Sequence, residues 1–112
     1  MSDLTYPDFM KVDIRVGTIL EAKENNMLRK PSIILKIDFG KQIGTKKSSA
    51  QLKANYEAKD LINKQVAAVI NFPPKQIGKT ISEVLVVGFP NKQNEAILIS
   101  PDIKVGNGGK LY

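Results

Sequence analysis

The stretch IILKIDF, residues 33–39, decides the fold class of this chain. Its odd-numbered residues, Ile33, Leu35, Ile37 and Phe39, are all apolar, and the residues between them include a lysine and an aspartate. A period of two is that of a β-strand with one buried face, because successive side chains point to opposite sides of the backbone. This is the clearest strand in the sequence.

The segment before it predicts a second, longer strand. Val12, Ile14 and Val16 alternate on even positions, but Ile19 continues the apolar pattern on the odd ones. The phase changes at Gly17–Thr18, as it would if a β-bulge inserted one extra residue there. We therefore expect a long strand that bends near this glycine.

Three further apolar runs continue the pattern toward the C-terminus. Residues 65–70, 81–87 and 96–99 are short, rich in β-branched side chains and bounded by glycine, proline or asparagine. These features favour strands over helices. Turns are expected at residues 40–44 and 90–94.

Helix signals are few. Thr5 followed by Pro7 predicts one capped turn through Met10, and residues 54–62 predict two turns that end at Asn63. A bent first strand, a strand pair, a short helix and a final hairpin follow one another in the order of an OB-fold. The expected class is thus an all-β barrel with short helices, of the OB-fold type.

The composition limits the chemistry. The chain has 112 residues, 42% hydrophobic and 25% charged, which predicts a single globular domain over residues 1–112. Without histidine or cysteine it lacks imidazole bases, thiol nucleophiles, disulfides and the usual zinc ligands. Ser48 and Ser49 have only lysines as possible bases, and the acidic residues are dispersed. We expect neither an enzyme nor a bound cofactor or metal.

The charge balance favours an anionic partner. Seventeen Lys and Arg residues against eleven Asp and Glu give a formal charge of +6. The most cationic window, residues 41–53, contains Lys41, Lys46, Lys47 and Lys53 and no acid. Such a window fits either an anion-binding surface or a strand edge that lysines guard against aggregation.

The first residues carry acids where a signal peptide would carry lysines, and the longest apolar runs are about five residues. Both observations argue against an export signal and against a bilayer-spanning helix. We therefore expect a cytoplasmic protein without membrane insertion.

Residues 71–74, Asn-Phe-Pro-Pro, form the most informative loop. Two prolines cannot continue a strand, so the loop should hold Asn71 and Phe72 rigidly. Phe72 could stack on a base or be a core or dimer contact, and the Asn71 amide could recognise a ligand or close its own loop. The GKT at residues 78–80 lacks the first glycine of a phosphate loop, and the glycines of residues 106–109 predict a turn.

Several separated motifs resemble one family. They are VDIRVGTI at residues 12–19, RKP at 29–31, KIDFG at 36–40, IGTKKSSAQ at 43–51, NFPP at 71–74, IG at 77–78 and SEVLVVG at 82–88. In this order and spacing they closely resemble the CsaA family of export-related, chaperone-like proteins. That family is part of a tRNA-binding-domain superfamily that includes C-terminal appendages of methionyl- and phenylalanyl-type synthetases and endothelial monocyte-activating polypeptide. The resemblance covers nearly all of residues 9–112.

The resemblance implies a noncatalytic OB-fold that forms a homodimer through a helical arm at residues 1–11 and a C-terminal segment at residues 100–112. Apolar residues at both ends, such as Tyr6 and Tyr112, agree with a dimer. Ser32 and Gly106 depart from the family pattern, which bears on loop rigidity and dimer contacts. The residues expected to contact nucleic acid or peptide are Arg29, Lys30, Lys46, Lys47, Ser48, Ser49, Gln51, Asn71, Phe72, Pro74, Gln76, Ile77, Ser82 and Glu83.

The first function that these features indicate is RNA binding. Lysines would bind the phosphates of tRNA or another structured RNA, while Ser49, Asn71 and Ser82 would hydrogen-bond bases or sugar edges. A dedicated, structure-specific tRNA-binding module would need nothing more.

The second function is that of a homodimeric, export-related chaperone that also binds RNA. An apolar pocket near the dimer seam, walled by Phe72, Pro74 and Ile77, would take unfolded or pre-secretory polypeptides. The sequence alone does not separate the two functions, because a basic rim around an apolar groove suits both ligands. A purely structural role in an assembly is the third possibility.

Overall fold

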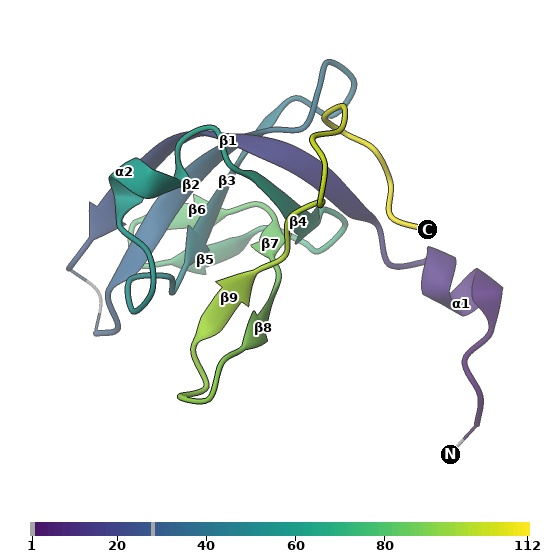
Figure 1. Cartoon of the computed structure of the whole chain (residues 1–112), viewed down its shortest axis with the longest axis horizontal. Coiled ribbons are helices and arrows are strands. Elements are labelled where there is room, and N and C mark those ends of the chain that lie inside the picture. The colour runs from purple at the N-terminus through teal and green to yellow at the C-terminus, as the bar shows by residue number, and fades with distance from the viewer. Residues whose placement is uncertain (1, 28) are drawn as a thin grey trace.

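The computed structural model describes residues 2–27 and 29–112 and consists mainly of strands (Figure 1). The elements in chain order are α1 (Tyr6–Met10), β1 (Ile14–Asn25), β2 (Ser32–Asp38), β3 (Thr45–Ala50), α2 (Ala58–Leu61), β4 (Gln65–Val69), β5 (Lys75–Ile77), β6 (Thr80–Ser82), β7 (Leu85–Val86), β8 (Gly88–Pro90) and β9 (Ala96–Leu98). Five antiparallel strands form one curved sheet in the order β3-β2-β1-β4-β7. β5 pairs with β6, and β8 pairs with β9, as two separate hairpins.

The sheet curls into a half-barrel, and the residues that precede β7 bridge back to its β3 edge. β1 pairs with β4 along its N-terminal half and with β2 along its C-terminal half. At the other edge, Glu83 N donates to Lys47 O at 2.8 Å and Ser49 N donates to Ser82 Oγ at 3.1 Å. β3 therefore contacts the end of β6 and the residue that follows it, and the predicted all-β, OB-type architecture is confirmed.

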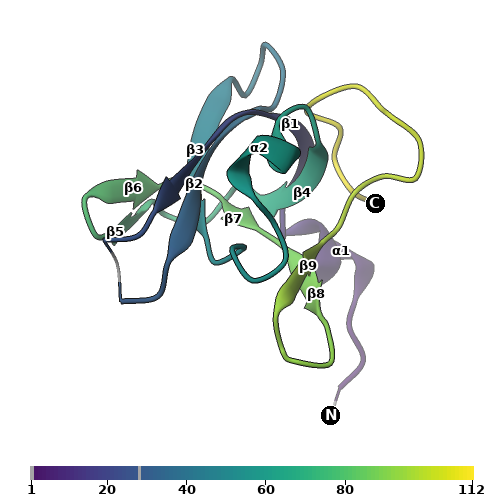
Figure 2. The ribbon, with the colours of Figure 1, turned by 60° about the vertical axis from the view of Figure 1, so that its left-hand side comes forward.

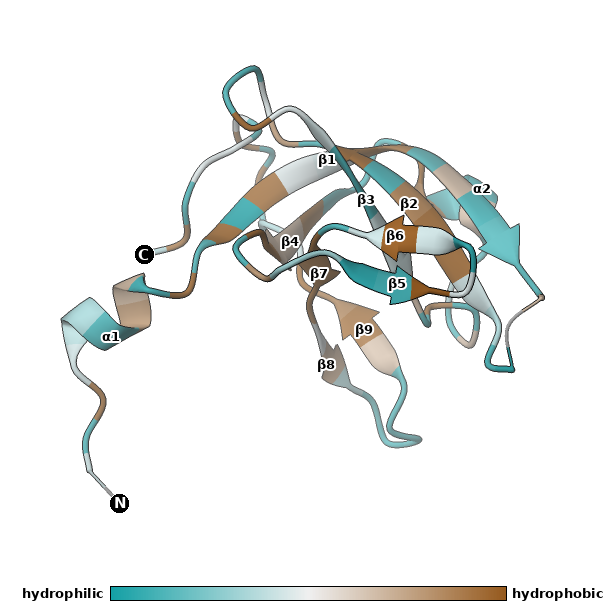
Figure 3. Cartoon of the chain, turned by 180° about the vertical axis from the view of Figure 1, so that it is seen from behind, coloured by the Kyte–Doolittle hydropathy of each residue, from teal (hydrophilic) through white to brown (hydrophobic). Residues whose placement is uncertain are grey.

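The deciding stretch at residues 33–39 forms β2 as predicted. Its odd-numbered side chains are at most 1% exposed and form the centre of the core. Lys36 is on the opposite face and is exposed. Figure 3 shows this alternation of polar and apolar residues along β1 and β2. Apolar residues of β1, β4 and α2 complete the core.

The bulge in β1 is not where the sequence predicted it. The register with β2 shifts just after Ile19, so Leu20 is the extra residue, and the predicted slip at Gly17–Thr18 is wrong. Both faces of the N-terminal half of β1 are covered instead. Gly17 and Ile19 face the barrel interior, while Val16 contacts the C-terminal segment on the other face. A strand covered on both faces can be apolar on even and odd positions without any slip.

The predicted N-terminal turn is present as α1. Thr5 Oγ1 accepts a hydrogen bond from Asp8 N at 3.2 Å, and Pro7 occupies the first turn. α1 projects away from the barrel, ahead of β1 (Figures 1 and 3). In the part of the chain that the structure describes, no helix has the length and apolar character to cross a membrane.

The second helix is shorter than the predicted range of residues 54–62. α2 covers four residues, and residues 54–57 do not belong to it. Tyr56 gives the physical reason, because its hydroxyl accepts a hydrogen bond from Leu98 N at 3.0 Å and ties this segment to β9. Asn63 ends the segment in the left-handed conformation, with φ of 70°, as expected.

β4 and β9 lie within their predicted runs, β3 lies in the basic window, for which a strand edge was one interpretation, and β8 lies outside every predicted run. The run at residues 81–87 is divided between β6 and β7, because Glu83 turns its main chain toward β3. β5 was not predicted, and together with β6 it forms a hairpin that lies over the outer face of the sheet (Figure 3). Figure 2 shows this hairpin and the C-terminal segment on opposite sides of the barrel.

The C-terminal segment, residues 99–112, lies against β4 and β1. Gln65 holds it by both ends of its amide: Nε2 donates to Val105 O at 2.7 Å, and Oε1 accepts from Val105 N at 3.0 Å. Thr18 Oγ1 donates to Asn107 Oδ1 at 2.7 Å. We call Gln65, Thr18 and Asn107 the C-terminal clasp.

Candidate nucleic-acid interface

A basic groove lies between the outer face of the sheet and the β5–β6 hairpin. Lys23 on β1, Lys36 on β2 and Lys47 on β3 line it from the sheet, and Lys79 lines it from the hairpin turn. Its volume is about 670 Å³. We call the space lined by these four lysines the basic groove.

Four lysines and two acids, Glu21 and Glu83, line the basic groove, so its side chains carry a net positive charge. Lys36 and Lys47 are direct partners in the register of β2 and β3, and like charges in that position destabilise a sheet. Glu21 is the partner of Lys36 on β1. Even so, none of the four groove lysines forms an ion pair with a described residue. Such a surface attracts anions.

The residues of the basic window do not share one face. Lys46 is the partner of Ile37, on the face opposite to Lys47, and its Nζ is 4.0 Å from Glu83 Oε2. Ser48 is 1% exposed, inside the core. The structure therefore places Lys47 in the groove and leaves Ser48 out of reach of a ligand.

Ser49, Ser82 and Glu83 bond to the chain itself. Ser49 N donates to Ser82 Oγ at 3.1 Å, and the Ser82 hydroxyl donates to a main-chain carbonyl at 3.3 Å. The hydroxyls of Ser49 and Ser32 share a hydrogen bond of 3.2 Å. Glu83 Oε1 accepts from Lys47 N at 3.1 Å. These bonds fix the backbone that carries Lys47 and use most of the polar groups that the sequence had assigned to base recognition.

Asn71 joins two segments that are far apart in the sequence. Its Oδ1 accepts from Asp13 N at 3.0 Å, and its Nδ2 donates to Lys11 O at 2.7 Å. These bonds attach the loop after β4 to the link between α1 and β1. Both ends of the amide are engaged, which supports a structural role for this side chain.

Arg29 and Lys30 are exposed in the loop between β1 and β2. Met27 of the same loop lines a small pocket together with Lys79. Since Lys79 also lines the basic groove, the loop lies beside one end of it. Arg29 and Lys30 are thus exposed in a loop that reaches one end of the groove, although neither lines the groove itself.

The two predicted glutamines lie at different places. Gln76 Nε2 donates to Gly78 O at 2.7 Å and stabilises the turn of the β5–β6 hairpin. Gln51 is exposed after β3 and lines a separate pocket with Pro31. The structure does not bring Gln51 into the basic groove.

An apolar pocket of about 320 Å³ adjoins the groove, and we call it the Phe72 pocket. Phe72, Ile77 and Leu85 line it, and Phe72 is 54% exposed. Two of the three predicted walls are thus present. The proline of this pocket is Pro73, whereas Pro74 lines the basic groove.

Three groove lysines were not among the predicted contacts. Lys36 could have been found, since it lies on the polar side of the strand at residues 33–39. Lys23 reaches the outer face only because of the bulge at Leu20, which the sequence placed elsewhere. The place of Lys79 depends on how the hairpin folds over the sheet, for which the local sequence carries no signal.

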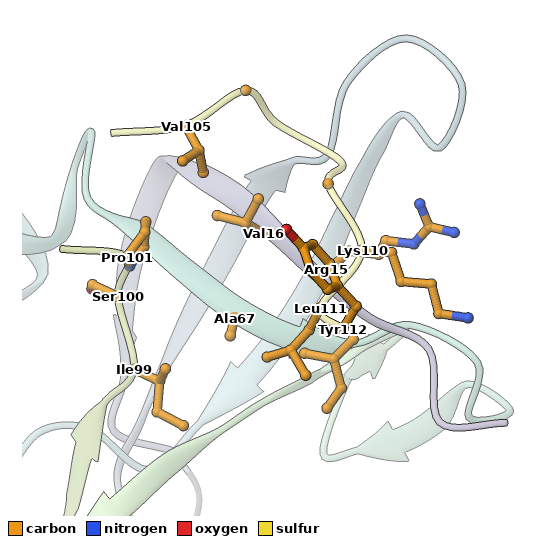
Figure 4. A pocket seen from close by; sticks show the side chains of 13 residues that line it. Arg15, Val16, Ala67, Ile99, Ser100, Pro101, Val105, Lys110, Leu111 and Tyr112 are labelled. Carbon is orange, nitrogen blue, oxygen red and sulfur yellow. The ribbon is translucent and has the colours of Figure 1, made fainter. Parts of the chain in front are cut away.

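A second apolar pocket, the C-terminal pocket, lies between the C-terminal segment and strands β1 and β4. Val16, Ile99, Val105 and Leu111 surround one space of about 520 Å³ (Figure 4). Tyr112 lines it as well and is 96% exposed. This is an open apolar surface at the end of the barrel away from the basic groove.

Known proteins share this sequence pattern. The family model described as "Putative tRNA binding domain" matches residues 14–110. The chain is 35% identical over 111 residues, or 99% of its length, to the methionine–tRNA ligase of Pyrococcus horikoshii, of which it covers 15%. It is 35% identical over 109 residues, or 97% of its length, to that of Methanococcoides burtonii, of which it covers 16%. It thus spans a small part of these relatives. The chain belongs to the tRNA-binding-domain family.

Among solved structures, this chain is similar to two proteins described as CsaA chaperones. The chaperone CsaA of Bacillus anthracis is 40% identical, with a TM-score of 0.91 over 99% of this chain and 100% of that one. The CsaA chaperone protein of Picrophilus torridus is 48% identical, with a TM-score of 0.89 over 98% and 100%. A MetRS-related protein of Pyrococcus horikoshii, at 20% identity and a TM-score of 0.87 over the full length of both chains, shows the fold alone. The resemblance to the CsaA family is confirmed.

Proposed function

We propose that this chain binds tRNA or a similarly structured RNA in the basic groove and catalyses no reaction. The observation that carries the proposal is the direct pairing of Lys36 with Lys47. Two like charges held opposite each other, without an ion pair to a described residue, are stabilised when phosphates approach. Membership of the tRNA-binding-domain family favours RNA over other polyanions.

Recognition in the groove is of the backbone rather than of base sequence. Lysine acts as a point charge on a phosphate. The groups of Ser49, Ser82 and Asn71 that could read a base are hydrogen-bonded within the chain. An A-form helix presents phosphates and 2′-hydroxyls in a regular array. Binding should therefore follow the shape and charge of the RNA.

Filter binding of a tRNA by two double variants tests this proposal. Lys36→Ala with Lys47→Ala removes two groove charges, and Lys59→Ala with Lys92→Ala removes two charges from α2 and from the β8–β9 turn. We expect the first to lower affinity strongly and the second to change it less than about threefold, since only groove lysines contact phosphates. Equal losses would mean that net charge alone attracts the RNA.

We also propose a homodimer, formed through the arm at residues 1–11 and the segment at residues 100–112. Its support is exposed apolar area at both ends: Leu4 is 72%, Tyr6 66% and Tyr112 96% exposed, and the C-terminal pocket lies beside Tyr112. A second copy would cover these side chains. Sedimentation should give a dimer at micromolar concentration, weakened by removal of residues 1–10. A monomer at that concentration contradicts the proposal.

A chaperone role for unfolded or pre-secretory polypeptides in the cytoplasm is the second candidate. It is favoured by the similarity to two structures described as CsaA chaperones and by the apolar Phe72 pocket. The alternative is a dedicated tRNA-binding module. A labelled unfolded peptide should bind with little salt dependence if the chaperone role holds, because apolar burial is not screened. Failure to bind at micromolar concentration favours the dedicated module.

A further inference from the structure

Two sites of different chemistry meet at Glu83. This residue lines both the basic groove and the Phe72 pocket. The loop between β4 and β5 also serves both sites, because Pro74 lines the groove and Pro73 lines the pocket. The two sites are therefore neighbours, and one ligand can occupy both.

The basic groove is lined in part by Ile34, Pro74 and Ile81, but among the described residues it offers no aromatic ring for a base to stack on. OB-folds that bind single strands stack successive bases on aromatic side chains. The groove is therefore suited to the phosphates of a base-paired strand, whose bases remain stacked within the helix.

The Phe72 pocket supplies the aromatic face that the groove lacks. Phe72 is 54% exposed, although prolines restrain the loop that carries it. Leu85, which is 50% exposed, adds apolar surface to the same pocket. Lys75 lines the pocket too and forms no ion pair with a described residue. An aromatic face with an ammonium group beside it complements one nucleotide, with the base on the ring and the phosphate on the lysine.

The polar groups of the pocket favour a base over a peptide. An extended peptide gains affinity from main-chain hydrogen bonds to its receptor. Here Ser49 N and Ser82 Oγ bond to each other, and Glu83 Oε1 accepts from the main chain of β3. Stacking needs only contact between the face of the base and the face of the Phe72 ring. A base can therefore bind where few hydrogen-bonding groups are free.

We propose that the Phe72 pocket binds one unpaired nucleotide next to an RNA helix held in the basic groove. This inference rests on the proposed RNA binding and specifies its ligand: a helix that ends in, or is interrupted by, an unpaired nucleotide. Because Ser49 N, Ser82 Oγ and Glu83 Oε1 are engaged within the chain and Lys75 offers only a point charge, the identity of the base should matter little.

Fluorescence anisotropy with three labelled RNAs tests this inference on the full chain. One is a blunt hairpin, and the others carry the same stem with a short unpaired extension at the 3′ or the 5′ end. We expect one of the extended hairpins to bind about tenfold more tightly than the blunt one, the gain of a stacked base. All four bases in the extension should give a similar gain.

Two variants locate that gain. Phe72→Ala should abolish it and leave the blunt hairpin bound as by the parent, whereas Phe72→Trp should keep it. Phe89→Ala is the matched control, because Phe89 is 68% exposed on β8 and should not affect either RNA. Melting curves of all three variants should match the parent, since the substituted rings are exposed.

The outcomes separate this inference from the proposed function. If extended and blunt hairpins bind equally well to the parent, or if Phe72→Ala keeps the gain, the nucleotide pocket is wrong and RNA binding stands. If no RNA binds, the proposed function itself fails. If Phe72→Ala loses only the binding of an unfolded peptide, the pocket belongs to polypeptides and the inference is overturned.

Discussion

The basic groove and the C-terminal clasp use polar side chains in opposite ways. In the clasp, Gln65 is 8% exposed and bonds both main-chain groups of Val105. In the groove, Lys36 and Lys47 are direct strand partners and form no ion pair with a described residue. A chain selected for stability alone would place an acid opposite Lys36 on β3. This difference supports the proposal that the groove serves a ligand, whereas the clasp serves the fold.

Lys47→Glu should have the largest effect, because it should change stability and RNA affinity in opposite directions. It converts the like-charged pair with Lys36 into an opposite-charged pair, which should raise stability by at most about 1 kcal/mol. The gain is limited because the new carboxylate also lies near Glu83, whose Oε1 accepts from the main-chain N of residue 47. RNA affinity should fall more than roughly tenfold, because one phosphate no longer has an ammonium partner and faces a carboxylate instead. Thermal melting and filter binding of the same preparation measure both. A loss of affinity together with a loss of stability would contradict the assignment of roles.

Gln65→Ala tests whether the C-terminal clasp contributes to stability and not to RNA binding. Removing the amide leaves both main-chain groups of Val105 without their partner, which should cost about 1–3 kcal/mol of unfolding free energy. Below the melting transition, RNA affinity should remain that of the parent, since the groove lies elsewhere. Denaturant unfolding and filter binding check the two expectations. Unchanged stability would show that the C-terminal segment is not held by this residue.

Asn71→Ala tests whether this residue stabilises the fold, as the C-terminal clasp does, or binds a ligand, as the basic groove is proposed to do. Its two hydrogen bonds, to Asp13 N and Lys11 O, are exposed, and losing them should lower stability by about 1 kcal/mol. We expect tRNA and peptide binding of the folded variant to be unchanged. Weaker binding at constant melting temperature would restore Asn71 to the recognition surface.

The smallest effect expected is that of Lys46→Ala. Lys46 faces away from the groove, with its Nζ 4.0 Å from Glu83 Oε2. Its removal should change RNA affinity less than about threefold, whereas Lys47→Ala should lower it by roughly a factor of eight at about 0.1 M salt. Parallel titrations of the two variants compare adjacent residues of one strand. Equal losses would mean that RNA extends beyond the groove.

The fold could be predicted from sequence where the alternation of polar and apolar residues had a single cause, the burial of one face of a strand. β2 is buried on one face only, so its pattern indicated the strand directly. β1 is covered on both faces near Val16, and the same kind of pattern therefore suggested a bulge at the wrong place. The predicted length of the second helix was wrong because the Tyr56 hydroxyl accepts a hydrogen bond from β9, an interaction that no local sequence pattern contains.

The candidate site was predictable in its charge but not in its geometry. The basic window led to Lys47, yet a one-residue step in a strand reverses the face, which separates Lys46 from Lys47 and buries Ser48. Lys79 enters the groove only through the folding of the β5–β6 hairpin over the sheet. Side-chain type can be read along the chain, but the register of three strands decides which charges meet.

The most direct test of the central claim is the salt dependence of tRNA binding by the parent and by Lys36→Ala with Lys47→Ala. If these lysines bind phosphates, log K should fall linearly with log salt concentration for the parent. The slope of the double variant should be smaller by about 1.8, which is about 0.9 for each phosphate that is no longer neutralised. An identical slope for the two proteins, or no salt dependence in the parent, would contradict the assignment of the basic groove to RNA.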